Sequence, residues 1–368
     1  MVGNVVVVGA GVYGAAVSES LTRRGARVVV VDAGAPAGGT SGATFSWTNS
    51  CGKQPRAYHD LNVAGMEAHR RLADDAPGGG WYHEGGNLEW ADGEAGRAEL
   101  RAKVARVLEY GYEARLLGRA DVPALEPDLD PTGLPDEIAY FPREGWVEPV
   151  PLVGHLLARA TSGGAEVVRN DAVTAVETGA DGVRGVRLAS GRGIAADAVV
   201  NCAGPRAAEI ARLAGLDLPM RNTRGVLVYT SPAAVSVSHV VHAPRVHLRP
   251  DGAGRLLLHT PEVDAAVRVS DAGEVTVDEP AVEKVVEAGR ALYPGIRDVE
   301  VESVRVGERP IPGDGLPVLG RVAGLSGFHF AVSHSGATLC LHAGDLVAAE
   351  VLGEDRDDAL APFRFERF

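Results

Sequence analysis

The chain has 368 residues, of which 45% are hydrophobic and 23% are charged, and its formal net charge is −13. This composition is that of a compact globular protein and excludes disordered and collagen-like chains. Because the negative charge comes without clusters of lysine or arginine, we expect no nucleic-acid partner. The length exceeds the ~100–200 residues of a typical domain, so two associated lobes are predicted.

The three cysteines, Cys51, Cys202 and Cys340, lie far apart and form no C-x-x-C pair. Neither a disulfide framework nor a metal site is therefore predicted. The N-terminus enters a strand without a basic leader region, and no stretch reaches the ~18 apolar residues of a membrane-spanning helix. These features predict a cytoplasmic protein with no membrane span.

The first elements along the chain form a dinucleotide-binding unit. Residues 4–8 are a strand-like run, NVVVV, followed by the glycine motif GAGVYG at 9–14 and by a helical pattern that ends near Gly25. A second run of valines, 28–31, leads into Asp32. Strand, glycine turn, helix, strand and acid in this order predict binding of the ADP group that FAD and NAD share.

Each residue of the motif has a physical task. Gly9 permits the tight turn, and Gly11 lets a pyrophosphate approach the backbone. Gly14 allows the helix to pack closely on the strand, and the first N–H groups of the helix attract the phosphates. Asp32 is expected to accept hydrogen bonds from the ribose hydroxyls. The alternative, a tight turn in some other α/β domain, is disfavoured by the two flanking strands and the acid.

The residues after Asp32 favour FAD over NAD. A nicotinamide dehydrogenase normally continues with further β-α repeats, whereas residues 38–47, GGTSGATFSW, are small, polar and turn-prone. A helix is predicted at 58–73, and the sheet resumes only with a strand at 195–200 that runs into NCAG at 201–204. A nucleotide-binding domain interrupted by so long an insertion suits FAD.

At this point the chain resembles the FAD-dependent amino-acid oxidoreductases, the family of D-amino acid oxidase, glycine oxidase and monomeric sarcosine oxidase. The resemblance extends over most of the chain, and the last two motifs are more specific than the first because of their order and their distance from the C-terminus. The motifs are GAGVYG at 9–14, GTS at 39–41, FPREGWVEP at 141–149, NCAG at 201–204, GERPIPGDGLPVLG at 307–320 and SHSGAT at 333–338.

The resemblance implies an α/β fold with a discontinuous FAD-binding Rossmann-like domain and a second, α+β substrate domain built on a mixed sheet. We expect residues 1–50, 145–220 and 305–368 in the FAD-binding domain, and residues 51–144 and 221–304 in the substrate domain. The patterns of the substrate domain predict strands at 223–230, 239–248, 255–259 and 266–269, a helix at 279–292, and surface loops at 77–80 and 121–136.

The C-terminal region predicts a second helix N-terminus beside the cofactor. Residues 328–332 are typical of a strand, 333–336 of a turn, and the residues that follow have helical spacing until Gly353. The resemblance places the flavin ring here, where N–H groups near Gly336 and Ala337 can stabilise negative charge on its N1–C2=O edge. An ordinary strand-to-helix crossover is the alternative.

We expect FAD to be bound without a covalent link. The sarcosine oxidases attach FAD through a cysteine in the segment that resembles Arg309-Pro310, where this chain has none, and Cys340 lies on the following helix. The expected FAD-contacting residues are Gly9, Gly11, Val12, Tyr13, Gly14, Asp32, Ala33, Thr40, Ser41, Ala43, Thr44, Ser46, Val173, Ala203, Gly204, Ser335, Gly336, Ala337 and Thr338.

Arg309 is the leading candidate for a catalytic and substrate-binding residue. By motif it corresponds to the arginine that holds the substrate carboxylate in glycine and D-amino acid oxidases, and a guanidinium fork suits a carboxylate. Without the resemblance, Arg309 beside Glu308 is an ordinary solvated ion pair. Thr338 replaces a carboxylate-binding lysine of the sarcosine oxidases, which disfavours a small N-methyl amino acid as substrate.

Five further candidates surround the predicted ring. Trp47 and Asn49 follow the phosphate-contacting turn, and Trp47 either lines the substrate cavity or is a core aromatic. Arg255 and His259 lie on the strand that resembles the one supplying a lysine near flavin N5 in sarcosine oxidases, and a surface position is the alternative for Arg255. His334 either contacts flavin or substrate, or makes a structural hydrogen bond.

The predicted reaction is oxidation of a C–N bond of an amine or amino acid by hydride transfer to flavin N5, with oxygen, a quinone or another carrier as the final electron acceptor. This step needs orientation more than a strong base. The first alternative is an FAD-dependent dehydrogenase of a 2-hydroxy acid or other alcohol, with His259 or His334 as its base. The second is a non-catalytic flavin-binding scaffold.

Overall fold

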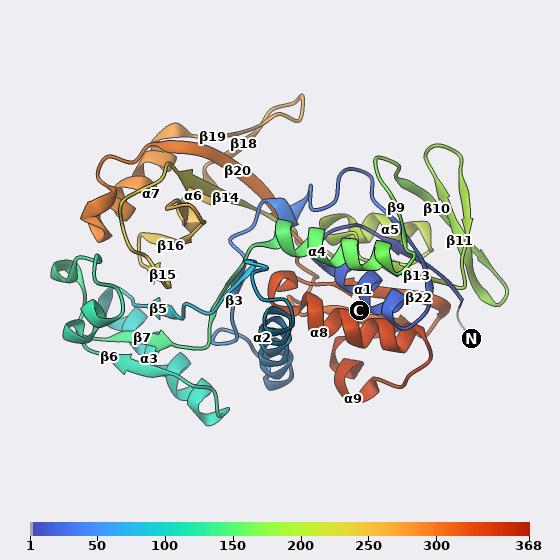
Figure 1. The fold of residues 1–368 in the computed structure, drawn as a ribbon, viewed down its shortest axis with the longest axis horizontal. Helices are drawn as coiled ribbons and strands as arrows, with labels where there is room; N and C mark the ends of the chain where they lie inside the picture. Colours follow the sequence, from blue (N-terminus) through green and yellow to red (C-terminus); the bar gives the residue numbers. More distant parts are fainter. Residues whose placement is uncertain (1–2) are drawn as a thin grey trace.

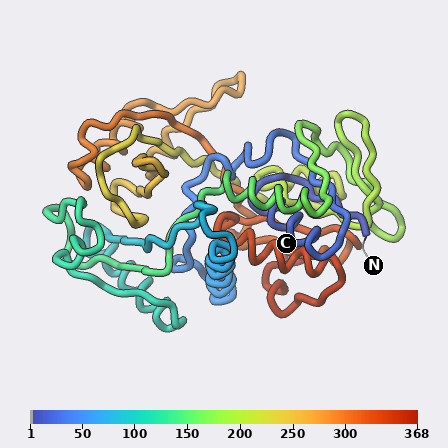
Figure 2. The backbone as a smooth tube through the Cα atoms, in the orientation of Figure 1, coloured from blue at the N-terminus to red at the C-terminus, as the bar shows by residue number. Residues whose placement is uncertain are grey.

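A computed structural model of the chain describes residues 3–368 and shows two lobes that lie side by side (Figure 1). The blue, green and red parts of the tube form one lobe, and the cyan and the yellow-to-orange parts form the other (Figure 2). The chain therefore passes between the lobes several times. We call the blue, green and red lobe the first lobe and its neighbour the second lobe.

A six-stranded sheet forms the centre of the first lobe. Val5 pairs in parallel with Val28 on one side and with Ala198 on the other. Because both faces of this sheet are covered, its central strands are continuous apolar runs. In spatial order the strands are β21 (Val318–Val322, antiparallel to its neighbour), β22 (Leu325–Val332), β13 (Ala198–Asn201), β1 (Asn4–Val8), β2 (Arg27–Val31) and β9 (Glu166–Val168).

Two layers cover this sheet. Val5 and Val7 of β1 point into a layer of helices, whereas Val6 and Val8 point to the opposite face, since side chains alternate along a strand. The first layer contains α1 (Val12–Arg23), α4 (Pro149–Ser162) and α8 (Gly336–Val351), and the second contains β10 (Val173–Gly179), β11 (Gly182–Leu188), β12 (Gly193–Ala195) and α5 (Ala207–Leu213).

Helix α2 (Arg56–Asp75) also packs on the first lobe, although its sequence was expected in the substrate domain. Its Tyr58 and Leu61 belong to the same buried cluster as the inner side of α8. A Cβ added at Gly65 would lie 2.4 Å from the carbonyl oxygen of Thr338. This glycine therefore lets α2 and α8 approach closely, which brings the segment before α2 against the start of α8.

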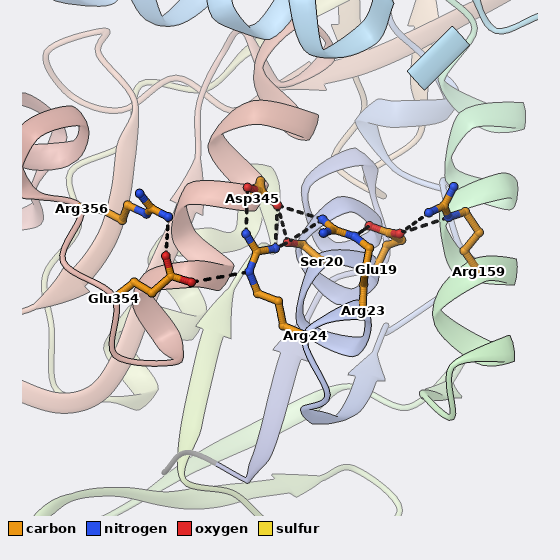
Figure 3. Close-up of polar contacts among 8 residues, drawn as sticks. All are labelled: Glu19, Ser20, Arg23, Arg24, Arg159, Asp345, Glu354 and Arg356. Atoms are coloured by element: carbon orange, nitrogen blue, oxygen red, sulfur yellow. Dashed lines mark hydrogen bonds and ion pairs between the residues drawn. The ribbon is translucent and has the colours of Figure 1, made fainter. Parts of the chain in front are cut away.

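Ion pairs tie α1, α4 and α8 together (Figure 3). Asp345 of α8 accepts a hydrogen bond from Arg24 Nη1 at 2.7 Å and another from Ser20 Oγ at 2.7 Å. Glu19 of α1 pairs with Arg159 of α4 at 2.9 Å. Although burial raises it, the hydrogen bonds from Arg24 and Ser20 lower the pKa of Asp345 to about 2. The helix layer is thus fixed at the end of α1 that lies away from the glycine turn.

A mixed eight-stranded sheet forms the second lobe, in which β5 and β15 pair in parallel and the other neighbours are antiparallel. Its order is β20 (Val301–Arg309), β14 (Thr223–Thr230), β17 (Leu256–His259), β16 (Val246–Pro250), β15 (Val240–Ala243), β5 (Asn87–Glu89), β7 (Ile138–Phe141) and β6 (Arg115–Leu117). The end of β20 belongs to this sheet, although residues 305–309 were expected in the FAD-binding domain.

Shorter elements complete the molecule. The second lobe includes α3 (Gly93–Glu109), α6 (Pro261–Ala265), α7 (Glu279–Leu292), β18 (Val267–Val269), β19 (Val275–Val277) and the 3-10 helices η2 (Arg119–Ala124) and η3 (Pro131–Gly133), which interrupt the predicted loop at 121–136. A small sheet of β3 (Trp47–Thr48), β8 (Gly145–Val147) and β4 (Tyr82–His83) lies between the lobes, and α9 (Asp357–Leu360) follows α8 (Figure 1).

The prediction of one strand at 239–248 is wrong, because the structure has a hairpin there. The chain reverses at Pro244 and Arg245, both of which are exposed. Proline has no N–H group to donate to a sheet and favours turns, so the continuous strand is broken at this point. The reversal places His242 directly opposite His247.

Candidate active site

A cavity of ≈ 640 Å³ runs along the carboxyl ends of β1, β13 and β22 toward strand β20. This volume falls within the ~300–1,000 Å³ of small-molecule sites. The N-termini of both α1 and α8 open into it. The predicted FAD-contacting residues that line it are Gly9, Gly11, Val12, Tyr13, Asp32, Ala33, Thr40, Ser41, Ala43, Thr44, Ala203, Gly204, Gly336 and Ala337.

The glycine turn leaves the backbone accessible at one end of the cavity. Gly9 has a φ of 104°, and a Cβ there would lie 2.5 Å from the carbonyl oxygen of Cys202. A Cβ at Gly14 would lie 1.8 Å from the carbonyl oxygen of Gly9, so Gly14 closes α1 onto the turn instead of lining the cavity. The Val12 N–H donates to Ser41 Oγ at 3.1 Å. This arrangement fits a pyrophosphate held against the start of α1.

Asp32 is held by backbone groups at the rim of the same end. Its Oδ2 accepts a hydrogen bond from Ala10 N at 2.6 Å, and its Oδ1 accepts one from Gly34 N at 2.7 Å. Each carboxylate oxygen has a second lone pair. The partly exposed side chain therefore retains acceptors, and its contact with the hydroxyls of a ribose stays a prediction.

The start of α8 forms the other end of the cavity. The Ser335 and Ser333 hydroxyls bond to Tyr58 Oη at 2.6 Å and to Tyr13 Oη at 2.8 Å, respectively. These bonds fix the turn before Gly336. The first N–H groups of a helix have no partner within the helix, so this end suits an electron-rich ring edge.

Three further predicted FAD contacts lie behind the lining of the cavity. Ser46 donates from Oγ to the Val147 carbonyl at 2.7 Å. Thr338 accepts a hydrogen bond at Oγ1 from Asn49 N at 3.4 Å. Val173 is buried at the start of β10, on the far face of the first sheet.

The cysteines fit a cofactor that is held without a covalent bond. All three are free and buried. Burial raises the pKa of the Cys202 thiol well above its usual range and that of Cys340 to about 12. Both side chains therefore stay protonated at neutral pH and lack the thiolate character that nucleophilic attack requires.

One face of the second sheet forms the wall opposite the first lobe. Gly307 of β20 lies so close to the segment 43–46 that a Cβ there would be 2.0 Å from the carbonyl oxygen of Ala43. The fully buried Arg249 of β16 donates from Nε to the carbonyl of Phe45 at 2.7 Å. The segment that follows the phosphate turn is therefore clamped between the cavity and this face.

Arg309 lies on the same face, two residues beyond Gly307. Its Nη1 donates to Asp264 Oδ2 at 2.8 Å and to the Arg224 carbonyl at 3.0 Å. Its Nη2 lies 3.4 Å from His259 Nε2. The guanidinium packs over Gly225, where a Cβ would lie 2.5 Å from Nη2. The guanidinium is thus oriented from behind by groups of three other elements.

Three histidines stand in one row across adjacent strands of this face. His242 of β15 is opposite His247 of β16, which is opposite His259 of β17. The ring centroids of successive pairs are 4.6 and 5.6 Å apart. Phe45 lies 5.9 Å from His242 and 6.1 Å from His259, so the row faces the segment that lines the cavity.

A buried carboxylate holds Trp47 against the end of this row. The centroids of the Trp47 and His242 rings are 4.1 Å apart. Trp47 Nε1 donates to Glu144 Oε2 at 3.1 Å, and Asn87 Nδ2 donates to the same oxygen at 3.3 Å. Asn87 Oδ1 lies 2.8 Å from His242 Nδ1. Trp47 is therefore a half-buried ring of the wall between the lobes, fixed by a side chain with no exposed surface.

His334 lines the cavity at the turn before α8. Burial, with smaller contributions from the positive charges of Lys53 and Arg309, lowers the pKa of His334 to about 4. The imidazole is therefore neutral at pH 7. The charge of Arg309, on the second lobe, therefore acts on His334.

Asn49 and Arg255, like Trp47, His259 and Arg309, are not among the residues that line the cavity. Asn49 donates from Nδ2 to the Trp47 carbonyl at 3.1 Å and is buried. Arg255 forms an ion pair with Glu302 on the surface. Four residues along a strand span about 13 Å, which carries Arg255 well away from His259.

Six residues of this site were missed by the sequence analysis. They come from separate segments of the chain. Only the region 246–250 has a sequence pattern that could have indicated a site, because His247 and Arg249 alternate there with apolar residues and so share one face of the strand. The six are Asn87, Glu144, His242, His247, Arg249 and Asp264.

Among residues 3–368, no group of His, Cys, Asp and Glu side chains is arranged to hold a metal ion. Within the same range, no helix combines the length and the apolar composition needed to cross a membrane.

Most of the chain matches a known protein family. Residues 4–350 match the family DAO, described as FAD dependent oxidoreductase. The chain belongs to this family. The predicted family, the α/β fold with several mixed sheets, the FAD cofactor and the enzymatic nature of the protein are thereby confirmed, and the alternative of a non-catalytic scaffold is set aside.

Curated relatives and solved structures extend over nearly the whole of this FAD-dependent oxidoreductase. The glycine oxidase of Bacillus licheniformis is 24% identical, over 98% of this chain and 96% of the relative. The crystal structure of glycine oxidase from Geobacillus kaustophilus has a TM-score of 0.85 and 26% identity, over 99% of this chain and 98% of the other. That of iminodiacetate oxidase from Chelativorans sp. BNC1 has a TM-score of 0.82 and 26% identity, over 98% of each chain.

Proposed function

We propose that this FAD-dependent oxidoreductase oxidises the C–N bond of an amine or amino acid that carries a carboxylate. The proposal rests mainly on the contacts that hold the guanidinium of Arg309 in place. Asp264 and His259 orient its guanidinium from behind, on a sheet face whose strand β20 also lines the cavity. FAD, when bound, accepts the two electrons and the hydrogen of the substrate carbon.

The protein's own residues orient the substrate and exclude water. A fixed guanidinium binds a carboxylate in one orientation, which presents the adjacent carbon to the cofactor at little entropic cost. Phe45 and Trp47 cover the face on which Arg309 lies. The start of α8 stabilises negative charge at the opposite end of the cavity.

The relatives support an amine substrate. They include two glycine oxidases and an iminodiacetate oxidase, which are named after amino acids. Glycine and iminodiacetate both combine an amine with at least one carboxylate, which is the combination that Arg309 suits. Either of these compounds, or a larger amino acid of the same class, is therefore the substrate that we propose.

Oxidation of a 2-hydroxy acid is the less favoured function. That reaction needs a base within reach of the hydroxyl. His259 Nδ1 faces two acceptors, the Val226 carbonyl at 3.1 Å and Asp264 Oδ1 at 3.4 Å, so it carries the proton and Nε2 faces Arg309. Burial lowers the pKa of His334 to about 4, which makes it a weak base. Neither predicted histidine is therefore poised for alcohol oxidation.

Replacement of Arg309 tests the proposal. Arg309→Leu is expected to raise the KM for an acidic amine roughly 10- to 100-fold, which corresponds to the loss of a hydrogen bond to a charged group, while the flavin content stays at the wild-type level. Arg255→Leu is the matched control, because it removes a surface arginine of the same lobe. Equal losses of flavin and of substrate affinity in Arg309→Leu would show that Arg309 is only structural.

A further inference from the structure

The middle histidine of the row has no hydrogen-bond partner. Among residues 3–368, neither ring nitrogen of His247 makes a hydrogen bond, although His242 and His259 on either side are both bonded. His247 is half-buried, so its ring is not sealed in the core. A half-buried imidazole normally has its polar atoms satisfied by the protein or by water. The free nitrogens of His247 therefore suit a ligand.

The neighbours of His247 are fixed in single tautomers. Because Glu144 is surrounded by donors, the amide nitrogen of Asn87 must face it, and the amide oxygen then faces His242. His242 Nδ1 must therefore carry a proton, which leaves Nε2 as an acceptor. His259 is fixed in the same tautomer by Val226 and Asp264. The row is thus a set of oriented imidazoles.

The charges around the row keep its imidazoles neutral. Burial, with smaller contributions from His259 and Lys103, lowers the pKa of His247 to about 4. Lys103 is itself paired with Glu89 at 2.5 Å, and Asp264 is paired with Arg309. A neutral imidazole offers one lone pair to a donor. The row therefore presents hydrogen-bond acceptors and no positive charge of its own.

A cation and these acceptors thus lie next to each other on one face. Arg309 lies at one end, beside His259, and His247 follows at the next strand, about 4.8 Å further across the sheet. Arg309 suits a carboxylate, and His247 suits an N–H donor. An α-amino acid carries both groups on one carbon, so it matches this order of partners.

We propose that His247 binds the amino group of the substrate, accepting a hydrogen bond from its N–H while Arg309 holds the carboxylate. Asn87 and Glu144 are positioning residues, which act through His242 on the ring of His247. This inference rests on the proposed function and narrows it, because it requires a substrate with an N–H group. An ether or a simple carboxylate of the same shape lacks that group, so it cannot donate a hydrogen bond to His247.

Two pairs of probes test the inference by binding as well as by turnover. Glycine is compared with acetate, and iminodiacetate with diglycolate, in which an ether oxygen replaces the N–H. Binding to the FAD-loaded protein is followed by the change in the flavin spectrum. His247→Phe is expected to weaken the amine of each pair roughly 10- to 100-fold and to leave its counterpart unchanged. His247→Gln, which retains an acceptor, is expected to restore most of the affinity.

The control variants separate this inference from the proposed function. Arg309→Leu is expected to weaken the amine and its counterpart alike, because both carry a carboxylate. Equal binding of the amine by wild type and His247→Phe overturns the role of His247 and leaves the proposed function intact. If the wild type binds 2-hydroxy acids and no amine, the proposed function itself fails. Flavin content and the thermal midpoint confirm that each variant folds.

Discussion

Asp264 holds Arg309 through a hydrogen bond of 2.8 Å from Nη1 to Oδ2, and the same carboxylate accepts the Val226 N–H at 2.6 Å. Asp264 lies in α6. Thr260 caps the N-terminus of this helix, and the Oγ1 atom of Thr260 accepts a hydrogen bond from Val263 N at 3.0 Å. The sequence resemblance pointed to the arginine alone. The structure adds the group that fixes its orientation.

Asp264→Asn tests this positioning role. An amide has a single carbonyl oxygen and no charge, so Arg309 and Val226 can no longer both bond to a charged acceptor. We expect the KM for an acidic amine to rise roughly tenfold with a smaller change in kcat. Asp278→Asn is the control, since Asp278 pairs with Arg268 on the surface. The same KM for Asp264→Asn and Asp278→Asn would contradict the role.

Gly225→Ala tests the orientation of Arg309 from the other side. The added methyl group would lie 2.5 Å from Nη2 and 2.6 Å from Cζ of Arg309, so the guanidinium must move. A misplacement of about 1 Å can cost on the order of 100-fold in rate, and we expect kcat/KM to fall toward that extent. Gly154→Ala in α4 is the control, because nothing lies within 4 Å of its added Cβ. The measurement is kcat/KM from steady-state kinetics of both variants, and equal values for Gly225→Ala and Gly154→Ala would contradict the expectation.

Stability is expected to decline as the pH falls from about 6.5 toward 4. Burial lowers the pKa of His329 to about 4 in the folded protein, whereas an exposed histidine has its ordinary value near 6.5. Between these values the unfolded chain binds more protons, so its stability relative to the folded chain increases as the pH falls. His329→Leu is expected to make the dependence shallower in urea unfolding at pH 7 and pH 5. If the free energy of unfolding depends on pH equally in the wild type and in His329→Leu, His329 does not cause the loss of stability.

FAD is expected to dissociate completely when the protein is denatured. Cys202 and Cys340 are buried thiols with raised pKa values, and no cysteine lies in the segment around Arg309. Acid precipitation of the purified protein should therefore leave all yellow colour in the supernatant. Flavin that remains with the precipitate after washing would demonstrate a covalent link.

The nucleotide end of the site was predictable because its residues are close in sequence. A tight turn and a buried strand impose their own residue types, so Gly9, Gly14 and Asp32 indicate their tasks without knowledge of the rest of the chain. The same holds for the helix at Gly336, where a strand, a turn and a helical pattern follow one another directly.

The row of three histidines could not be predicted, because it depends on strand pairing between distant segments. In a single strand from 239 to 248, His242 and His247 would point to opposite faces, since they are five residues apart. The turn at Pro244 reverses the chain and places both on one face. Asn87 and Glu144 reach the end of this row from another part of the chain, and nothing local to either indicates it.

We propose that the protein oxidises an amine that carries a carboxylate. The most direct measurement mixes the FAD-loaded enzyme, without oxygen, with a panel of amino acids that includes glycine and iminodiacetate, and with the matching 2-hydroxy acids. We predict that the visible flavin absorbance bleaches with at least one amino acid and that Arg309→Leu requires a much higher concentration of it. Bleaching by 2-hydroxy acids alone, or by no acid while dithionite still reduces the flavin, would contradict the claim.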